Sequence, residues 1–305
     1  MKENRIGGGI CDLIAIIHIL AKNVDIGIDI DVLRKLFLHS PDLVYIRKWV
    51  PNYMKRKLVI FFCLLFAIAV ESIAQNAFVD YQKSFNRVAD VFRRKEDTLK
   101  KQFAARNLEW PVKYVYIRSF KYDSELEVWV RNSLTEEFKH FKTYKVCALA
   151  GTLGPKRIQG DYQVPEGIYY INEFKHNSAY HLSLGLNYPN ASDRLLSDLV
   201  EPGGDIYIHG SCVTQGCIPI TNPQIEELYI LASHARGAGQ DFIPVHIFPV
   251  RFNVKKSVAY LENQVKNDPD LKKFEYKLKQ VFDFFEANKQ IPVVAVDTKG
   301  DYVLY

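Results

Sequence analysis

The sequence lacks a strong excess of one charge, an internal repeat, a low-complexity tract and a dense set of cysteines. Its 40 Lys and Arg residues stand against 35 Asp and Glu residues, a formal net charge of +5. So small an excess excludes the positive field with which nucleic-acid-binding proteins hold a polyanion. A hydrophobic content of 48% over 305 residues excludes a disordered tail protein, and five cysteines are too few for a small disulfide scaffold.

A long apolar run is also missing, because the longest one, residues 58–70, is shorter than the roughly 20 residues of a spanning helix. It follows the basic string Lys55-Arg56-Lys57 and precedes small residues at Ser72 and Ala74. These features are typical of a secretory signal peptide. We therefore predict a signal peptide at 54–74, cut after Ala74, and an exported protein of the periplasm or cell envelope.

Residues 1–53 precede this segment, although the export machinery reads a signal peptide at the N-terminus of a chain. The simplest interpretation is that Met54 is the true start and that 1–53 is an upstream extension of the gene model. The alternative is an N-terminal extension with an unusual membrane anchor. Intact-mass analysis of the natively expressed protein distinguishes the two, because only the second retains Met1.

The spacing of apolar residues predicts an α+β fold. Helical spacing from Phe78 to Phe103 predicts one amphipathic helix within a leading segment at 75–110. From 111 to 255 a β-rich domain is expected, in which Asn222 caps a helix that ends near Gly237. Residues 256–305 should add a helix from Asp268 to Asn288 and a closing hairpin at 291–296 and 302–305. The strands predicted from alternation lie at 114–118, 125–130, 140–149, 167–173, 179–187, 205–209 and 242–252.

The segment 205–219 carries the residues with reactive chemistry. His209 ends an apolar strand, a loop of small residues follows, and Cys217 stands shortly before a helix. A thiol, an imidazole and exposed backbone amides are the components of nucleophilic acyl transfer. A thiolate beside a protonated histidine has a lowered pKa, which would make Cys217 reactive at neutral pH.

Two other interpretations of this segment remain open. After cleavage at Ala74 the chain keeps three cysteines, so at least one thiol is unpaired within it. Cys212 and Cys217 could form a disulfide, while Cys147, in an apolar strand pattern, favours a buried thiol that packs as a small hydrophobic group. A zinc site of His209, Cys212, Cys217 and His181 is the second alternative, although the Cys-x₄-Cys spacing is looser than usual.

The string His209-Gly210, followed by Thr214-x-Gly216-Cys217, resembles the signature of the YkuD-type L,D-transpeptidase catalytic domain. The short gap between His209 and Cys217 is most similar to the YafK branch of that family. Further segments of the resemblance, which covers roughly 110–255, are 124–130, 153–156, 160–167, 181–190 and 244–249.

This resemblance implies a β-rich domain, with mixed sheets in a β-sandwich-like arrangement and flanking helices, and an enzyme without cofactor or metal that acts on peptidoglycan stem peptides. Cys217 would attack the carbonyl of the L-centre of diaminopimelate, and His209 would be the base. The amides around Thr214, Gly216 and Cys217 would hold the oxyanion. An amine acceptor gives transpeptidation, and a wall-attached protein is a further acceptor or substrate.

The sequence differs from the family signature at two positions, which limits the residue roles that the resemblance implies. Pro219 stands where many members have Arg or Asn, which removes one side-chain contact to the substrate carboxylate. Gly210 follows His209 and offers no side chain to orient the imidazole, so the sequence does not identify the orienting group, for which a backbone carbonyl is one candidate.

Three more side chains are candidates for substrate binding. His181 could line the groove or be a half-buried structural histidine. Lys156 and Arg194 could clamp the carboxylates of diaminopimelate, or brace loops on the surface. As alternatives to transpeptidation we consider a peptidoglycan amidase or peptidase that resolves the acyl-enzyme with water, an inactive wall-binding module and a zinc-stabilised domain.

Overall fold

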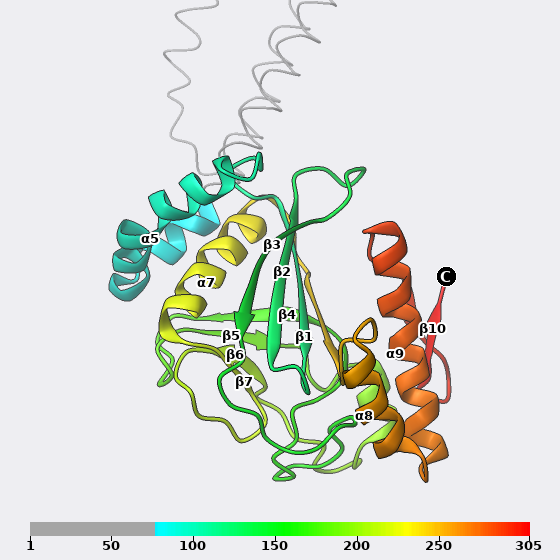
Figure 1. The fold of residues 1–305 in the computed structure, drawn as a ribbon. Helices are drawn as coiled ribbons and strands as arrows, with labels where there is room; N and C mark the ends of the chain where they lie inside the picture. Colours follow the sequence, from blue (N-terminus) through cyan, green and yellow to red (C-terminus); the bar gives the residue numbers. More distant parts are fainter. Residues whose placement is uncertain (1–76) are drawn as a thin grey trace, which may run out of the picture. The chain divides into compact units, whose positions relative to one another are not determined.

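A curled, mixed sheet of eight strands organises the part of the chain that the structure, a computed structural model, describes: residues 77–305 (Figure 1). The predicted extension and signal peptide lie outside this range. The strand order is β3-β2-β1-β8-β4-β5-β6-β7, and only β1 with β8 and β6 with β7 run parallel. The strands are β1 (Tyr114–Phe120), β2 (Glu125–Arg131), β3 (Lys139–Lys145), β4 (Gly167–Lys175), β5 (Ser183–Leu186), β6 (Tyr207–His209), β7 (Ile218–Pro219) and β8 (Ile243–Phe248).

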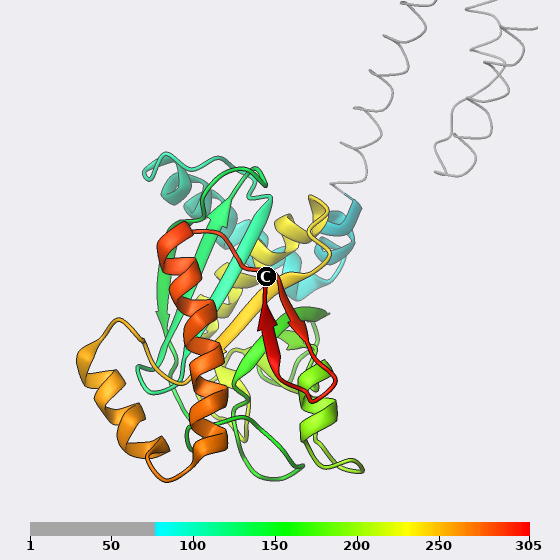
Figure 2. The ribbon, with the colours of Figure 1, turned by 90° about the vertical axis from the view of Figure 1, so that its right-hand side faces the viewer.

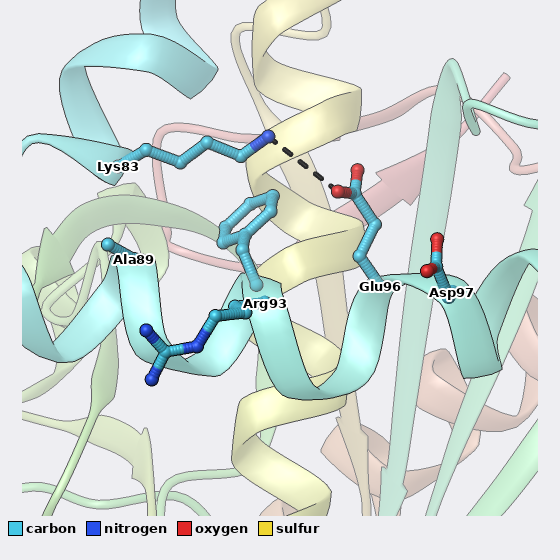
Figure 3. Close-up of a pocket in the computed structure, with 6 residues that line it drawn as sticks. Lys83, Ala89, Arg93, Glu96 and Asp97 are labelled. Atoms are coloured by element: carbon cyan, nitrogen blue, oxygen red, sulfur yellow. Dashed lines mark ion pairs between the residues drawn. The ribbon is translucent and has the colours of Figure 1, made fainter.

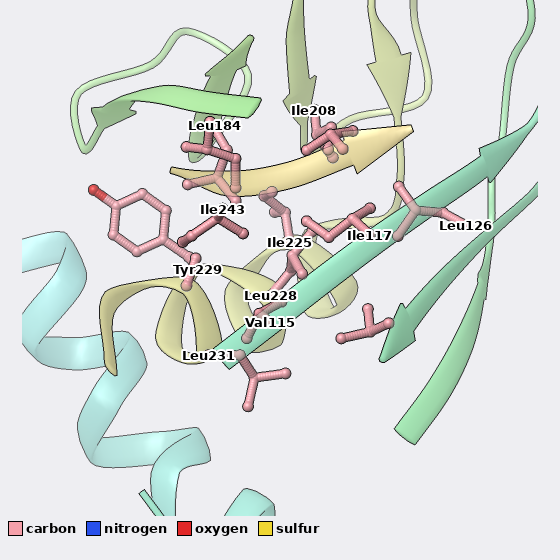
Figure 4. Packing of buried hydrophobic residues seen from close by; sticks show 14 of the residues in the cluster. Val115, Ile117, Leu126, Leu184, Ile208, Ile225, Leu228, Tyr229, Leu231 and Ile243 are labelled. Atoms are coloured by element: carbon pink, nitrogen blue, oxygen red, sulfur yellow. The ribbon is translucent and has the colours of Figure 1, made fainter. Parts of the chain in front are cut away.

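One face of the sheet packs against helix α7 (Asn222–Gly237), which in turn packs on α5 (Asn86–Ala104). Figure 4 shows Leu184 of β5 and Ile208 of β6 within this core, on the same side as Tyr229 of α7. Because side chains alternate along a strand, His209 must project from the opposite face of β6.

Helix α9 (Pro269–Asn288) covers the other face over β1, β2 and β8 (Figure 2). Its Phe282 and Phe285 pack on Phe120 and Tyr116 of β1, so β1 is buried on both sides. The hairpin of β9 (Val294–Val296) and β10 (Tyr302–Leu304) follows, as predicted. The structure confirms the α+β class and adds two unpredicted helices, α6 (Ala191–Leu196) and α8 (Lys255–Val265).

The predicted leading helix is wrong in one respect, because it is broken at residues 84–85. The chain is helical over 77–83, and α5 begins at Asn86 after an extended Phe85. The Ser84 hydroxyl donates a hydrogen bond of 2.7 Å to the carbonyl of Tyr81, which competes with continued helix. Phe85 meanwhile stacks on His176, with ring centroids 3.4 Å apart. The Ser84 hydrogen bond and the stacking of Phe85 on His176 together interrupt the helix that the apolar spacing predicts.

The broken helix leaves a shallow groove around α5 (Figure 3). Lys83 lies over the ring of Phe92 at 4.5 Å and forms an ion pair of 3.7 Å with Glu96. The remaining lining residues are Ala89, Arg93 and Asp97. None of them belongs to the segment 205–219. Among the helices of residues 77–305, none is both long and apolar enough for a transmembrane span.

A buried acid pair joins α9 to the end of the loop before β4. Glu166 forms an ion pair of 2.9 Å with Lys121, and Glu275 of α9 is buried against Glu166. Burial, and then repulsion from the Glu166 carboxylate, raises the pKa of Glu275 well above its usual value. The folded protein therefore holds a proton on Glu275 that the unfolded chain releases near pH 4.5.

Glu275→Gln should stabilise the protein at alkaline pH. A raised carboxyl pKa favours the folded state fully below the unfolded pKa, and this contribution is lost as the pH rises through the folded pKa. Glutamine donates to Glu166 without ionising, so the free energy of unfolding should exceed that of wild type by about 1–2 kcal/mol at pH 8 and match it near pH 4. Urea titrations at both pH values, with Glu262→Gln on α8 as the exposed control, measure this. An equal difference at the two pH values would contradict the assignment.

Candidate active site

Strand β6, which lies next to the edge strand β7, carries His209 on the sheet face opposite α7. The strand register sets His209 opposite Ser183 of β5 on one side and Pro219 of β7 on the other. The His209 carbonyl accepts a hydrogen bond of 2.9 Å from the backbone N–H of Ile220. The side chain is 1% exposed, so its position is fixed by strands on both sides.

A backbone carbonyl orients the imidazole of His209. Its Nδ1 lies 2.5 Å from the carbonyl oxygen of Gly210, and because a carbonyl only accepts, Nδ1 carries the proton. Nε2 is then the basic nitrogen, as a general base requires. The ring of Tyr180 stacks on the imidazole at a centroid distance of 4.6 Å. Burial lowers the pKa of His209 below its usual 6.5, so the ring is neutral at pH 7.

Cys217 lies beside β6 at the start of β7. Its half-buried thiol donates to the carbonyl of Asp205 at 3.5 Å, and the backbone of Tyr207 hydrogen-bonds to the sulfur. Burial raises the pKa of the thiol. The expected thiolate with a lowered pKa is therefore wrong for this state: thiol and imidazole are both neutral, because each is removed from water.

The side chain of Thr214 holds the turn before the thiol. Its hydroxyl donates to the carbonyl of Cys217 at 2.7 Å and accepts from the N–H of Gly216 at 3.1 Å. Gly216 has φ +131°, and a Cβ there would lie 3.1 Å from the carbonyl oxygen of Gln163. Glycine is therefore required beside Cys217 for both backbone conformation and space.

Helix α7 anchors the other end of the loop. The side chain of Asn222 accepts a hydrogen bond of 2.9 Å from the N–H of Ser211, which has a positive φ of 67°. The predicted cap is wrong by one residue, since Thr221 is the N-cap and donates its N–H to Gln224 at 3.0 Å. Asn222 is thus free to hold the loop between His209 and Cys217. Sequence reasoning missed this role, because an Asn-Pro pair reads as a helix start.

A disulfide between Cys147 and Cys212 ties the same loop to the segment after β3. It corrects three expectations: Cys147 is not an isolated buried thiol, Cys212 does not pair with Cys217, and Cys212 is not available as a zinc ligand. Cys147 also donates its N–H to the Pro219 carbonyl at 3.0 Å, which brings the two segments together. Cys217 remains a free thiol.

Removing this disulfide should destabilise the protein markedly. The bridge closes a loop with a sequence separation of 65, so the double variant Cys147→Ser, Cys212→Ser should lose about 2–4 kcal/mol of unfolding free energy. Chemical denaturation measures the loss. Cys217→Ser is the matched control and should stay within about 0.5 kcal/mol of wild type. Equal effects of the two substitutions would contradict a structural role for the bridge.

The three predicted substrate-binding residues lie in different settings. Nε2 of His181 donates a hydrogen bond of 2.8 Å to the Glu226 carboxylate of α7, as in a half-buried structural histidine. Lys156 is buried and ion-paired with Asp161. The contacts of His181 and Lys156 therefore favour a structural role, in which both side chains brace loops, over substrate binding. Arg194 lies exposed on α6.

Comparisons with known proteins show the family of the chain. The YkuD family model, described as the L,D-transpeptidase catalytic domain, matches residues 123–247. YafK of Escherichia coli strain K12, named as a candidate L,D-transpeptidase, is 34% identical over 192 residues, which cover 62% of this chain and 73% of that protein. The same values hold for YafK of Escherichia coli O157:H7.

Two solved structures show weaker likeness. The helical cell shape determining protein Pgp2 of Campylobacter jejuni is 19% identical, with 60% of this chain and 73% of that chain covered and a TM-score of 0.36. The corresponding values for Bd1075 of Bdellovibrio bacteriovorus are 23%, 57%, 63% and 0.34. The identity and coverage of YafK decide the assignment: this chain belongs to the YkuD-type L,D-transpeptidase family.

Proposed function

We propose that this protein is an exported peptidoglycan L,D-transpeptidase in which Cys217 is the nucleophile and His209 the general base. The observation that carries the proposal is the fixed tautomer of His209, whose Nδ1 donates to the Gly210 carbonyl and leaves Nε2 basic. The free thiol of Cys217 lies beside the same strand. Family membership supplies the substrate class, the stem peptides of peptidoglycan.

The reaction begins from a neutral pair. Nε2 of His209 takes the thiol proton as the Cys217 sulfur attacks the carbonyl of the L-centre of diaminopimelate. The bond to the following D-residue breaks, and the imidazolium returns its proton to the departing amine. An acceptor amine then attacks the thioester, loses a proton to Nε2, and regenerates the thiol. The raised pKa of Cys217 makes the base necessary, because little thiolate exists beforehand.

The oxyanion of each tetrahedral intermediate needs backbone donors. The Gly216 amide is engaged by the Thr214 hydroxyl in this structure. We therefore assign the oxyanion contacts to the backbone N–H of Cys217 and to N–H groups of the adjoining loop. Thr214 and Gly216 orient these N–H groups. Of the two predicted carboxylate clamps, Arg194 remains a proposal that rests on its exposure alone, and Lys156 is assigned to bracing the loops. His181, the predicted groove contact, is assigned to the same bracing role.

Export also belongs to this proposal. The predicted signal peptide at 54–74 would deliver the domain to the periplasm, where peptidoglycan lies. The Cys147–Cys212 disulfide supports this location, because disulfides persist in oxidising compartments.

Product analysis tests the transferase assignment. Residues 75–305 are incubated with purified disaccharide-tetrapeptide and a candidate amine, and the masses of the products are measured by mass spectrometry. A stem that carries the amine supports the transpeptidase. A stem that is shorter by its terminal D-residue and ends in a free carboxylate identifies a hydrolase, which could also release a wall-attached protein. Wall binding without either product would make the domain an inactive binding module.

A further inference from the structure

A second group of charged side chains lies on the His209 face of the sheet. Strand β6 carries Tyr207 two residues before His209, so both side chains share one face. A register shift in β4 between Ile171 and Glu173 changes which face the following residues occupy. Phe174 consequently packs toward Tyr229 of α7, whereas Glu173 and Lys175 lie on the face of Tyr207.

The hydroxyl of Tyr207 collects three charged groups. It donates to the Glu173 carboxylate at 2.9 Å, accepts from the Lys175 ammonium at 3.3 Å, and lies 3.4 Å from the carboxylate of Asp205. Lys175 also lies over the tyrosine ring at 4.8 Å. We refer to Glu173, Lys175, Asp205 and Tyr207 as the Tyr207 cluster. Burial, and then the hydrogen bond to Glu173, raises the pKa of Tyr207, so the hydroxyl keeps its proton.

Glycine at position 185 lets this cluster form. Gly185 of β5 lies between Glu173 and Tyr207 in the sheet. A Cβ there would lie 2.9 Å from the Cβ of Glu173 and 3.1 Å from Cε1 of Tyr207, closer than ordinary contact. Because Gly185 has no side chain, the Tyr207 hydroxyl and the Glu173 carboxylate can meet above it.

The charged side chains of the Tyr207 cluster do not neutralise one another. One hydroxyl proton cannot satisfy two carboxylates, and the group carries one positive and two negative charges. Within residues 77–305, Lys175 forms no direct ion pair, and neither do Glu173 and Asp205, whose carboxylates are exposed. Such a group can accept both an ammonium and a carboxylate without first breaking a salt bridge.

The Tyr207 cluster is also continuous with the reactive thiol. The carbonyl of Asp205 accepts from the Cys217 thiol at 3.5 Å, and the backbone of Tyr207 hydrogen-bonds to the same sulfur. The Tyr207 cluster therefore lies directly beside the proposed nucleophile. Position, unmatched charge and shared backbone point to a substrate subsite.

We propose that the Tyr207 cluster binds a zwitterionic α-amino-acid head group, with the ammonium on Glu173 and Asp205 and the carboxylate on Lys175. This inference rests on the proposed function, in which the head group is the free D-centre of diaminopimelate next to the acylated L-centre. The cluster would set the preference for a diaminopimelate stem over one with a simple amine.

Equilibrium binding tests the subsite without turnover. In a Cys217→Ala background, isothermal titration measures the dissociation constants of three disaccharide-tetrapeptides: the free diaminopimelate form, a form amidated at the D-centre carboxylate, and a form acetylated at its amine. The free form should bind roughly tenfold more tightly than either modified form, since each charge-assisted contact contributes on that order.

Single substitutions then assign each charge. Lys175→Met should remove the preference for the free over the amidated stem, and Glu173→Gln should reduce the preference over the acetylated stem. Lys145→Met and Glu137→Gln, at exposed positions elsewhere, are matched controls that should change neither. Equal affinities for the three stems, no measurable binding, or a uniform loss across all three in Lys175→Met would overturn the inference. Acylation of wild-type protein by the same stem, measured separately, shows whether the proposed function still stands.

Discussion

Cys217→Ala is expected to lower turnover of a tetrapeptide stem by on the order of 10⁴-fold or more. Two other nucleophilic groups of the loop are engaged: Cys212 is bridged to Cys147, and the Thr214 hydroxyl is bound to the Cys217 carbonyl. The loss should lie in the chemical step, so binding of the stem should persist. Single-turnover kinetics with wild type and variant measure it.

The fold should survive this substitution, because the anchors of the loop do not involve the thiol. Asn222, the disulfide and the Thr214 hydroxyl all remain in place. Gln215→Ala, an exposed neighbour on the same loop, is the matched control and should retain nearly full activity. If Cys217→Ala kept activity within tenfold of wild type, the sulfur could not be the nucleophile.

His209→Gln should have the second largest effect, a loss of about 10²–10⁴-fold at pH 7. Glutamine keeps a polar side chain of similar reach but cannot take a proton. The raised pKa of Cys217 then leaves the variant dependent on a small thiolate fraction. Its rate should rise about tenfold per pH unit between pH 7 and 9, because that fraction grows with pH.

The wild-type pH profile follows from the same neutral pair. Activity needs unprotonated Nε2, and burial lowers the pKa of His209 below 6.5. The value of kcat/KM should therefore stay near its maximum at pH 7 and fall on the acid side with a midpoint below pH 6.5. An acid limb above pH 7, or a His209→Gln variant with an unchanged profile, would contradict the base assignment.

Local patterns in the sequence were sufficient for the main elements of the fold. The strand patterns predicted every strand of the eight-stranded sheet except β7, and apolar spacing predicted α7 and α9. The break at Ser84 was not predicted, because it depends on a ring contact between Phe85 and His176. Helix α8 was missed because no strong start signal precedes Lys255: its N-cap is Val254, whose side chain cannot cap.

The candidate site was predictable in its residue types and not in its arrangement. The short string from His209 to Cys217 is local, so its chemistry is visible in one segment. The partner of Cys212 is 65 residues away, and three cysteines allow three pairings. The Tyr207 cluster depends on a register shift in β4, which places Glu173 on an unexpected face. Long-range register and pairing are properties of the assembled sheet.

The most direct test of Cys217 as the nucleophile is peptide mapping of the acyl-enzyme by mass spectrometry. Wild-type residues 75–305 are quenched with acid during turnover of the diaminopimelate tetrapeptide and then digested. We expect an adduct on Cys217 that adds the mass of the stem minus the free D-amino acid released from its end, and this adduct should be absent from Cys217→Ala. An adduct on another residue, or product formation while Cys217 remains unmodified in every quenched sample, would contradict it.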